Sequence, residues 1–373
     1  MTAFLNIEED ELHSKNGYWT AKEIAQQPDV WQEVAQTLSE TKSIINAWLA
    51  PILAIKNLRI ILTGAGTSAY IGEAIAPSLT NHLSRQVEAV ATTVLVSCPD
   101  QYFLRDKPTL IISYARSGNS PESLAACALA DQLVDDCYHL AVTCNKKSKL
   151  ISYLDDKKNS HVVLMPEDTL DRSFAMTSSF SSMLLATLCI FCPDAAQLNI
   201  AAKLSRTIIS DHTKLIKKHA SIPFSRAVFL GSGGLLAVAT EAQLKMLELS
   251  AGKIDCYAES SLGFRHGPKL IVDEKTLIVM LHSNNKYTKK YDEDLLHELM
   301  RDNKTTHIFD ISKILATKNT ELDDVWLSLP YIVYCQILAF YKSIALDITP
   351  DNPCPTGEAN RVVQGVTIHP FKD

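Results

Sequence analysis

Two short polar loops in the first half of the chain combine hydroxyl groups with glycine, which is the chemistry of a phosphate site. Gly64-Ala-Gly-Thr-Ser68 follows one run of apolar residues, and Arg116-Ser-Gly-Asn-Ser120 follows another. Each loop leads into an Ala-rich segment typical of a helix. A helix N-terminus presents free backbone N–H groups and a positive dipole end to an anion. We therefore expect both loops to bind one phosphate group.

The groups expected to contact the phosphate are small residues, hydroxyls, an amide and one cation. They are Gly66, Thr67, Ser68, Arg116, Ser117, Asn119 and Ser120. Ser68 and Ser120 also suit the N-cap of the helix that follows each of them, and Pro121 suits the first helical position. Both serines can therefore be simple helix caps, and capping is compatible with phosphate contact.

The first loop also fits an alternative, a dinucleotide-binding turn. The pattern Gly64-x-Gly66-x-x-Ala69 matches the glycine fingerprint of such turns. That fingerprint also requires an acidic residue about 20 residues further on, at the end of the second strand. Glu88 lies before the apolar run 90–96, which we expect to be this strand, and not after it. We therefore expect no nicotinamide cofactor.

A second set of polar residues, in the other half of the chain, can transfer protons. Glu241, Lys245 and Glu248 are spaced i, i+4 and i+7 in a segment typical of a helix, so they share one helix face. Alone, this pattern favours a surface salt-bridge ladder. His266 precedes Gly267-Pro268 in an expected loop, where an imidazole can exchange protons near neutral pH. Its alternative is an ordinary hydrogen-bonded loop histidine.

The elements that position these groups alternate between short apolar strands and helical stretches, which predicts a parallel sheet covered on both faces. In the first half, strands are predicted at 58–62, 90–96, 110–113, 139–144 and 162–165, and helices at 68–83, 120–134, 146–154, 177–190 and 195–219. Residues 1–57 are also expected to be helical. Ligands bind beyond the carboxyl ends of the strands in such sheets, which is where both hydroxyl loops lie.

The second half repeats the first, which predicts two copies of one α/β unit. Gly64 corresponds to Gly231, a shift of 167 residues (231 − 64), whereas the hydroxyl at Ser68 is replaced by Leu235. We therefore infer that the first copy binds phosphate and the second does something else. In the second copy, strands are predicted at 227–231, 277–280, 305–311 and 325–329, and helices at 240–250, 292–302 and 331–346.

Composition bounds the class of protein. The 373 residues, 46% apolar and 21% charged, suit a soluble globular protein of about two domains. The net charge of −6 argues against nucleic acid or an anionic membrane as the main partner. The sequence contains no run of 18 apolar residues, so we expect no membrane span. Nine cysteines, mostly in apolar stretches, indicate reduced thiols in a cytoplasmic protein. Cys189-x-x-Cys192 lacks further ligands nearby, so we expect no metal site.

Taken together, these motifs resemble the sugar isomerase (SIS) family. The Thr63–Ser68 turn, the Ser117–Ser120 loop, Glu241–Glu248 and Arg265–Pro268 occur in the order and spacing of that family, over about residues 45–370. The resemblance implies two tandem SIS-type doubly wound parallel-sheet (flavodoxin-like) units with an N-terminal helical segment. The expected divisions are 1–44 for the helical segment, 45–200 and 201–350 for the two SIS domains, and 351–373 for a tail over the active site.

The chain is similar to the isomerase half of glucosamine-6-phosphate synthase, and this likeness implies roles for single residues. Glu248 would move the proton between C1 and C2 of the sugar. His266 would assist ring opening from the neighbouring subunit, which implies a homodimer with shared active sites. The synthase carries a tail lysine that forms an imine with the sugar, and Gln364, which stands at the matching position here, cannot do so.

The chain is more similar to one group within the family than to the synthase. Asp171–Phe180, Leu262–Pro268 and Asn360–Thr367 resemble the galactosamine-6-phosphate deaminase/isomerase group, also called tagatose-6-phosphate ketose/aldose isomerase. That resemblance implies conversion of galactosamine 6-phosphate to tagatose 6-phosphate and ammonia, without metal or cofactor. Ala175, Met176 and Thr177 would line the sugar. The alternatives are a plain phosphosugar aldose–ketose isomerase, a fructosamine-6-phosphate deglycase, or a non-enzymatic sugar-phosphate sensor.

Overall fold

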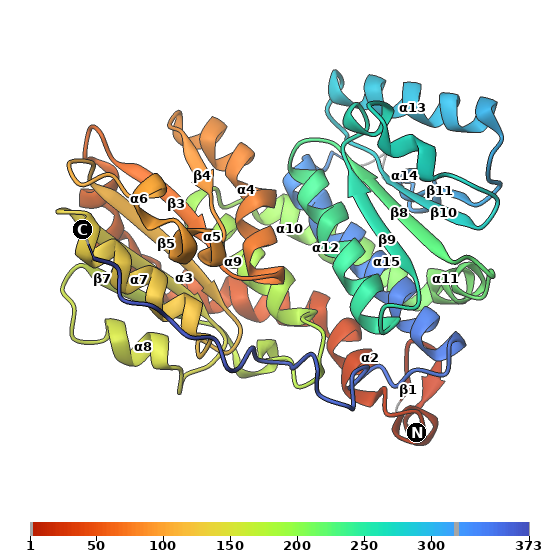
Figure 1. Cartoon of the computed structure of the whole chain (residues 1–373), viewed down its shortest axis with the longest axis horizontal. Coiled ribbons are helices and arrows are strands. Elements are labelled where there is room, and N and C mark those ends of the chain that lie inside the picture. The colour runs from red at the N-terminus through yellow and green to blue at the C-terminus, as the bar shows by residue number, and fades with distance from the viewer. Residues whose placement is uncertain (1–2, 317–320, 373) are drawn as a thin grey trace. The chain divides into compact units, whose positions relative to one another are not determined.

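A computed structural model describes residues 3–316 and 321–372 and divides into two compact units, each with its own parallel sheet. The first-sheet unit contains residues 29–171, 178–193 and 357–373, and the second-sheet unit contains residues 1–28, 172–177 and 194–356. The parallel α/β architecture expected from the sequence is confirmed, with short strands alternating with helices in both units (Figure 1). The domain boundaries drawn from the sequence stay a prediction.

The first sheet has five parallel strands in the order β4-β3-β5-β6-β7. By position along the chain this order is 2-1-3-4-5, which is that of flavodoxin-like sheets. The strands are β3 (Arg59–Thr63), β4 (Val87–Ala89), β5 (Thr109–Ala115), β6 (Cys137–Thr143) and β7 (Ser160–Leu164). Thr63 pairs with Ser113, so the chain leaves β3 and β5 at the same edge of the sheet.

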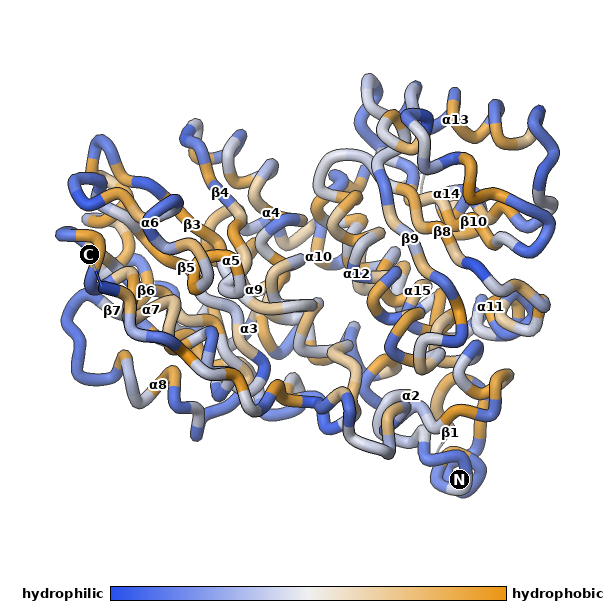
Figure 2. The backbone as a smooth tube through the Cα atoms, in the orientation of Figure 1, coloured by the Kyte–Doolittle hydropathy of each residue, from blue (hydrophilic) through white to orange (hydrophobic). Residues whose placement is uncertain are grey.

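Helices cover both faces of the first sheet because its strands are apolar on both sides, as the hydropathy in Figure 2 shows. The helical elements are α3 (Gln27–Leu53), α4 (Thr67–Leu83), α5 (Thr92–Ser97), α6 (Pro99–Tyr102), α7 (Pro121–Leu133), α8 (Lys149–Leu154), η1 (Glu167–Thr169) and α9 (Ser178–Phe191). Ile61 and Ile111, one residue from each central strand, pack with Leu95 of α5 and Leu129 of α7 in one buried cluster.

One strand predicted in this unit is wrong. Residues 90–96 were expected to be the second strand, but the strand is β4 and the run Thr92–Ser97 forms helix α5. The β-branched residues of this run favour a strand by intrinsic preference, yet α5 buries Thr92 and Leu95 against the sheet. Burial on the face of a sheet therefore outweighs the local preference.

The second sheet has four parallel strands in the order β11-β10-β8-β9, which is 4-3-1-2 along the chain. The strands are β8 (Arg226–Gly231), β9 (Asp255–Glu259), β10 (Thr276–Leu281) and β11 (Ile308–Asp310), and a small antiparallel pair, β1 (Ala3–Phe4) and β2 (Ile7–Glu8), lies outside the sheet. The helical elements are α1 (Glu9–Ser14), α2 (Tyr18–Ala25), α10 (Ala195–Thr207), η2 (Ile208–His212), α11 (Thr213–Ala220), α12 (Gly234–Leu249), η3 (Gly263–Arg265), η4 (Pro268–Ile271), α13 (Thr288–Asp302), α14 (Ile311–Ile314) and α15 (Asp324–Ala345).

Helix α15 is the core of the second-sheet unit and packs against α10, α11 and α12. The expected strand at 325–329 is wrong, because these residues form the first turns of α15. Every side chain from Val325 to Ser343 is buried, so the sequence has no alternation of apolar and polar residues there that would distinguish a strand from a helix. By length and composition α15 is also the one described helix apolar enough to cross a membrane, and 94% of its apolar window is buried inside the protein. It is therefore explained as a core helix.

Candidate active site

The two hydroxyl loops leave adjacent strands of the first sheet at the point where the strand order reverses. The chain turns to one side after β3 and to the other side after β5, and open α/β sheets bind ligands at such a reversal, beyond the carboxyl ends of the strands. The Gly64–Ser68 loop follows β3, and the Arg116–Ser120 loop follows β5. The structure therefore brings the two predicted phosphate loops to one edge of one sheet.

Glycine is required at two points of the first loop. A Cβ on Gly64 would lie 2.5 Å from the backbone carbonyl carbon of Ser68, and Gly66 has φ of +56°. Gly66 is the residue before the first turn of α4, so Ser68 lies inside that turn. The expectation that Ser68 is the N-cap is wrong. Thr67 and Ser68 are 4% and 5% exposed, and both belong to the first turn of α4.

The second loop is held by hydrogen bonds from its neighbours. Ser120 is the N-cap residue of α7, as expected, although its hydroxyl bonds to the Ser123 hydroxyl at 2.6 Å. The Asn119 side chain accepts a hydrogen bond from the Lys149 N–H at 2.9 Å, and so fixes the start of α8. The Ser117 hydroxyl accepts one from the Asn119 N–H at 3.3 Å. Asn119 is thus engaged in shaping the loop.

Arg116 is 7% exposed, and its guanidinium points to the C-terminal segment of the same unit. It donates a hydrogen bond of 2.5 Å to the Arg361 carbonyl oxygen, while the Arg361 side chain donates to the Asp171 carbonyl oxygen. The tail from Gly357 onward is thereby tied to the second loop. Gln364 lies further along this tail and is exposed. Arg361 and Asp171 were not selected as site residues, although both lie in motifs that the sequence analysis singled out.

The residues expected to line the sugar are grouped with the second-sheet unit. Ala175, Met176 and Thr177 are all buried and precede α9. The Ser173 hydroxyl donates to the Ala175 carbonyl oxygen at 3.1 Å and also to the Glu23 carboxylate, which is 3% exposed. A buried carboxylate on α2 therefore fixes the backbone of this segment.

The Glu–Lys–Glu face of α12 is buried, so its interpretation as a surface ladder is wrong. Lys245 and Glu241 are both 0% exposed, with Nζ 3.4 Å from the Glu241 carboxylate. The same Nζ lies 2.5 Å from the carboxylate of Glu248, whose side chain is 22% exposed. One ammonium thus joins a fully buried acid to one that reaches solvent. Buried charges require compensating partners, and here one ammonium lies between two carboxylates.

His266 lies in the turn between η3 and η4, and its side chain is exposed. The backbone N–H of His266 donates to the Gly263 carbonyl oxygen at 2.9 Å. The neighbouring Arg265 is turned to the Glu298 carboxylate of α13 at 2.8 Å. The imidazole is therefore presented on the surface of this unit, and the structure does not bring it to the Glu248 cluster by any described contact.

In the second-sheet unit, a carboxylate of the protein itself joins the segments that follow β8 and β10. One Asp292 carboxylate oxygen accepts hydrogen bonds from the hydroxyls of Ser232 and Ser261, at 2.6 and 2.5 Å, and the other accepts one from the Ser283 N–H at 3.0 Å. Ser232 and Ser283 follow β8 and β10, the pair corresponding to β3 and β5. Nearby, burial raises the pKa of Asp324, and the Asp292 charge raises it further. The carboxylate of Asp292 thus takes the place that an anion would occupy, and this residue was missed from the sequence.

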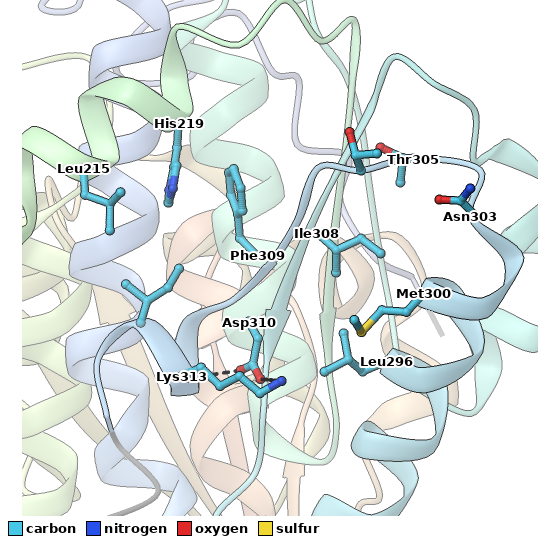
Figure 3. Close-up of a pocket in the computed structure, with 12 residues that line it drawn as sticks. Leu215, His219, Leu296, Met300, Asn303, Thr305, Ile308, Phe309, Asp310 and Lys313 are labelled. Atoms are coloured by element: carbon cyan, nitrogen blue, oxygen red, sulfur yellow. Dashed lines mark hydrogen bonds and ion pairs between the residues drawn. The ribbon is translucent and has the colours of Figure 1, made fainter.

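A cavity of about 480 Å³ lies elsewhere in the second-sheet unit, at the outer edge of β11 (Figure 3). Its walls combine apolar side chains, such as Leu296 and Met300, with the Asp310–Lys313 ion pair. His219 and Phe309 stack at its rim with ring centres 3.8 Å apart. None of the described residues predicted from the sequence for the active site lines this cavity.

Comparisons with known proteins agree on one family. The model of the SIS domain matches residues 52–192. The D-galactosamine-6-phosphate deaminase AgaS of Shewanella sp. is 51% identical over 370 residues, 98% of this chain and 96% of that protein. The Escherichia coli protein of the same name is 42% identical, over 95% and 97% of the two chains.

Solved structures extend this likeness to the fold. The tagatose-6-phosphate ketose/aldose isomerase from Escherichia coli superposes with a TM-score of 0.88 at 40% identity, covering 96% of this chain and 98% of that one. The C-terminal domain of the glucosamine-fructose-6-phosphate aminotransferase from Francisella tularensis, at 17% identity and a TM-score of 0.70, covers 90% and 98%, and it shows the shared fold alone.

Proposed function

This chain belongs to the SIS family, and we propose that it is a hexosamine-6-phosphate deaminase/isomerase that converts galactosamine 6-phosphate to tagatose 6-phosphate and ammonia. The observation that carries the proposal is the near-full-length identity of 51% to a D-galactosamine-6-phosphate deaminase. The paired hydroxyl loops and the Glu–Lys–Glu trio of α12 support it, because the reaction requires an anion site and a proton-transfer group.

The phosphate ester is assigned to the reversal point of the first sheet, beyond the carboxyl ends of β3 and β5. The hydroxyls of Ser68, Ser117 and Ser120, helped by Thr67, would hold its oxygens, together with backbone N–H groups at the start of α4. The strand order supports this assignment, because both loops lie at a reversal point of the sheet. The second sheet is not a rival phosphate site, because Asp292 occupies the corresponding position.

The proton transfer is assigned to Glu248. After the sugar ring opens, the C1 carbonyl acidifies the C2–H bond, and the carboxylate takes that proton and returns one to C1. Loss of the C2 proton gives an enolamine, and the proton returned to C1 converts it to an imine at C2, which water hydrolyses to the ketose and ammonia. The Lys245 ammonium 2.5 Å away holds the carboxylate in one orientation. General base catalysis of this kind contributes about 10²–10⁴-fold, and positioning supplies the remainder.

Ring opening is assigned to His266 of a neighbouring subunit, so the proposal includes a homodimer with shared active sites. The exposure of this imidazole supports a role at a surface that a second chain can cover. Ala175, Met176, Thr177 and Gln364 are assigned to the sugar end. The mechanism needs no metal or cofactor, since the carbonyl already activates C2. The proposal also places the enzyme in the cytoplasm.

An ammonia-coupled assay tests the function. Galactosamine, glucosamine and N-acetylated hexosamine 6-phosphates are compared under the same conditions with galactose 6-phosphate, which lacks nitrogen, and the product ketose is measured in parallel. The proposal predicts equimolar ammonia and ketose from galactosamine 6-phosphate. Ketose without ammonia from a sugar phosphate that lacks nitrogen would support the plain isomerase, which the name of the Escherichia coli structural relative favours. Binding without turnover of any of these compounds would support the sensor.

A further inference from the structure

A cluster of metal-ligand side chains lies at the amino end of the first sheet, away from the hydroxyl loops. Cys137 and His139 come from the start of β6, and Asp131 comes from α7. The His139 Nε2 lies 2.8 Å from the Asp131 Oδ1 and 3.4 Å from the Cys137 Sγ, and the three ligand atoms all lie within 4.8 Å of one another. His139 pairs with Ile111 of β5, and the four further residues to the carboxyl end of β5 span about 13 Å, so the cluster lies away from the hydroxyl loops.

The spacing of the three atoms is close to that of a tetrahedral zinc site. With zinc bonds of about 2.0–2.1 Å to nitrogen or oxygen and about 2.3 Å to sulfur, neighbouring ligand atoms are about 3.3 Å (N to O) and about 3.6 Å (N to S) apart. The two shortest separations in the cluster fall short of these values by about half an ångström or less. Small side-chain movements would therefore be enough for the three ligand atoms to bind one ion.

The groups around the cluster fix it in the way that outer partners fix metal ligands. The second oxygen of Asp131 accepts hydrogen bonds from the Tyr153 hydroxyl at 2.7 Å and from the Lys157 ammonium, which leaves Oδ1 facing His139. The backbone carbonyl of Cys137 accepts a hydrogen bond of 2.6 Å from the Asn159 side chain. Hydrogen bonds of this kind to ligating carboxylates orient them and tune their affinity.

Two of the three side chains in the cluster are buried, and the third is partly exposed to solvent. His139 is 1% exposed, and its Nδ1 is a buried nitrogen without a hydrogen-bond partner among the described residues. Cys137 is 6% exposed, whereas the Asp131 side chain is 22% exposed. An ion can therefore enter along the carboxylate and reach a thiol and an imidazole that solvent does not. A thiolate, an imidazole and a carboxylate together select zinc-type ions over magnesium or calcium.

We propose that Asp131, Cys137 and His139 form a binding site for a divalent transition-metal ion of the zinc type, distinct from the active site. On binding, the ion takes the position on the His139 Nε2 while the neutral imidazole carries its one proton on Nδ1, and the proton of the Cys137 thiol leaves to solvent. No oxidation or reduction takes place. A solvent molecule completes the coordination on the side of Asp131. Affinity rises with pH, since the ligands bind only when deprotonated.

Cobalt(II) titration of the full-length, chelator-treated protein tests the site. We expect one Co²⁺ per chain, with a thiolate-to-cobalt charge-transfer absorption and tetrahedral d–d bands that Zn²⁺ abolishes. Cys137→Ser removes the charge-transfer absorption, and His139→Gln weakens Co²⁺ binding at least about tenfold. The matched control is Cys189→Ser, a thiol of α9 outside the cluster, and it leaves the spectrum unchanged.

Circular dichroism and the urea denaturation midpoint show that each variant is folded. Wild-type protein that takes up no stoichiometric Co²⁺ overturns the proposal. So does a folded Cys137→Ser variant with an unchanged charge-transfer absorption. Loss of cobalt uptake in Cys189→Ser moves the site elsewhere and overturns it too. Because the readout is metal binding, a failure here is distinguishable from a failure of the proposed enzymatic function.

Discussion

Replacing Lys245 by Met tests whether the buried charge trio of α12 stabilises the protein. The side chain keeps its length, but Glu241, at 0% exposure, loses the ammonium 3.4 Å from its carboxylate. Removing one partner of a buried ion pair costs about 3–5 kcal/mol, because the remaining charge stays desolvated. At about 2–4 °C per kcal/mol for a large domain, Tm falls by about 10 °C.

Urea denaturation followed by circular dichroism measures the free energy of unfolding of four proteins: wild type, Lys245→Met, Glu241→Met and the double variant. The double variant buries no unpaired charge at these two positions. We therefore expect it to be more stable than Lys245→Met by at least about 2 kcal/mol. Lys269→Met is the matched control, since Lys269 pairs with Glu298 and Asp302 at the surface and its loss costs about 0–1 kcal/mol. A loss below about 1 kcal/mol in Lys245→Met, or equal losses in the single and double variants, refutes the reasoning.

Three further predictions follow from the loops and from one buried pair. Gly64→Ala places a Cβ 2.5 Å from the Ser68 backbone, so the loop must move, and we expect KM to rise and the free energy of unfolding to fall by about 1–3 kcal/mol, as measured by kinetics and urea denaturation. Ser117→Ala removes one hydrogen bond to a charged phosphate and raises KM about tenfold or more with little change in kcat; an unchanged KM excludes the contact. Burial opposes the Asp310 charge, but the hydrogen bond with His282 at 2.8 Å outweighs it and lowers the pKa of Asp310 to about 2. That contribution to stability is complete above the ordinary carboxyl pKa of about 3.9 and is lost as pH falls through about 2. Urea denaturation between pH 6 and 2 should therefore show that the free energy of unfolding falls more steeply with decreasing pH in wild type than in Asp310→Asn.

The positions of the hydroxyl loops were predictable because each depends on a local pattern. A glycine turn after an apolar strand needs only neighbouring residues, and β3 and β5 lie within a few residues of their predicted limits. The run 90–96 and the run 325–329 were assigned wrongly as strands. Both are apolar stretches with β-branched or aromatic residues, and their helical state is set by packing against a sheet and against three helices.

The charged groups of the second-sheet unit were the least predictable part of the site. Spacing alone placed Glu241, Lys245 and Glu248 on one face, but it favoured a solvated face, whereas the structure buries Lys245 and Glu241 completely. Asp292 was missed because two of its partners, Ser232 and Ser261, lie 60 and 31 residues away along the sequence. No local pattern marks a carboxylate that joins the segments following two strands.

The measurement that tests the account most directly compares substrate binding and turnover in Glu248→Gln. The substitution keeps the size and hydrogen bonding of the side chain but removes the base that is assigned to C2. Titration calorimetry with galactosamine 6-phosphate should give a Kd within a few-fold of wild type, whereas ammonia release should fall by about 10²–10⁴-fold. Near-normal ammonia release by this variant would contradict the assignment of proton transfer to Glu248.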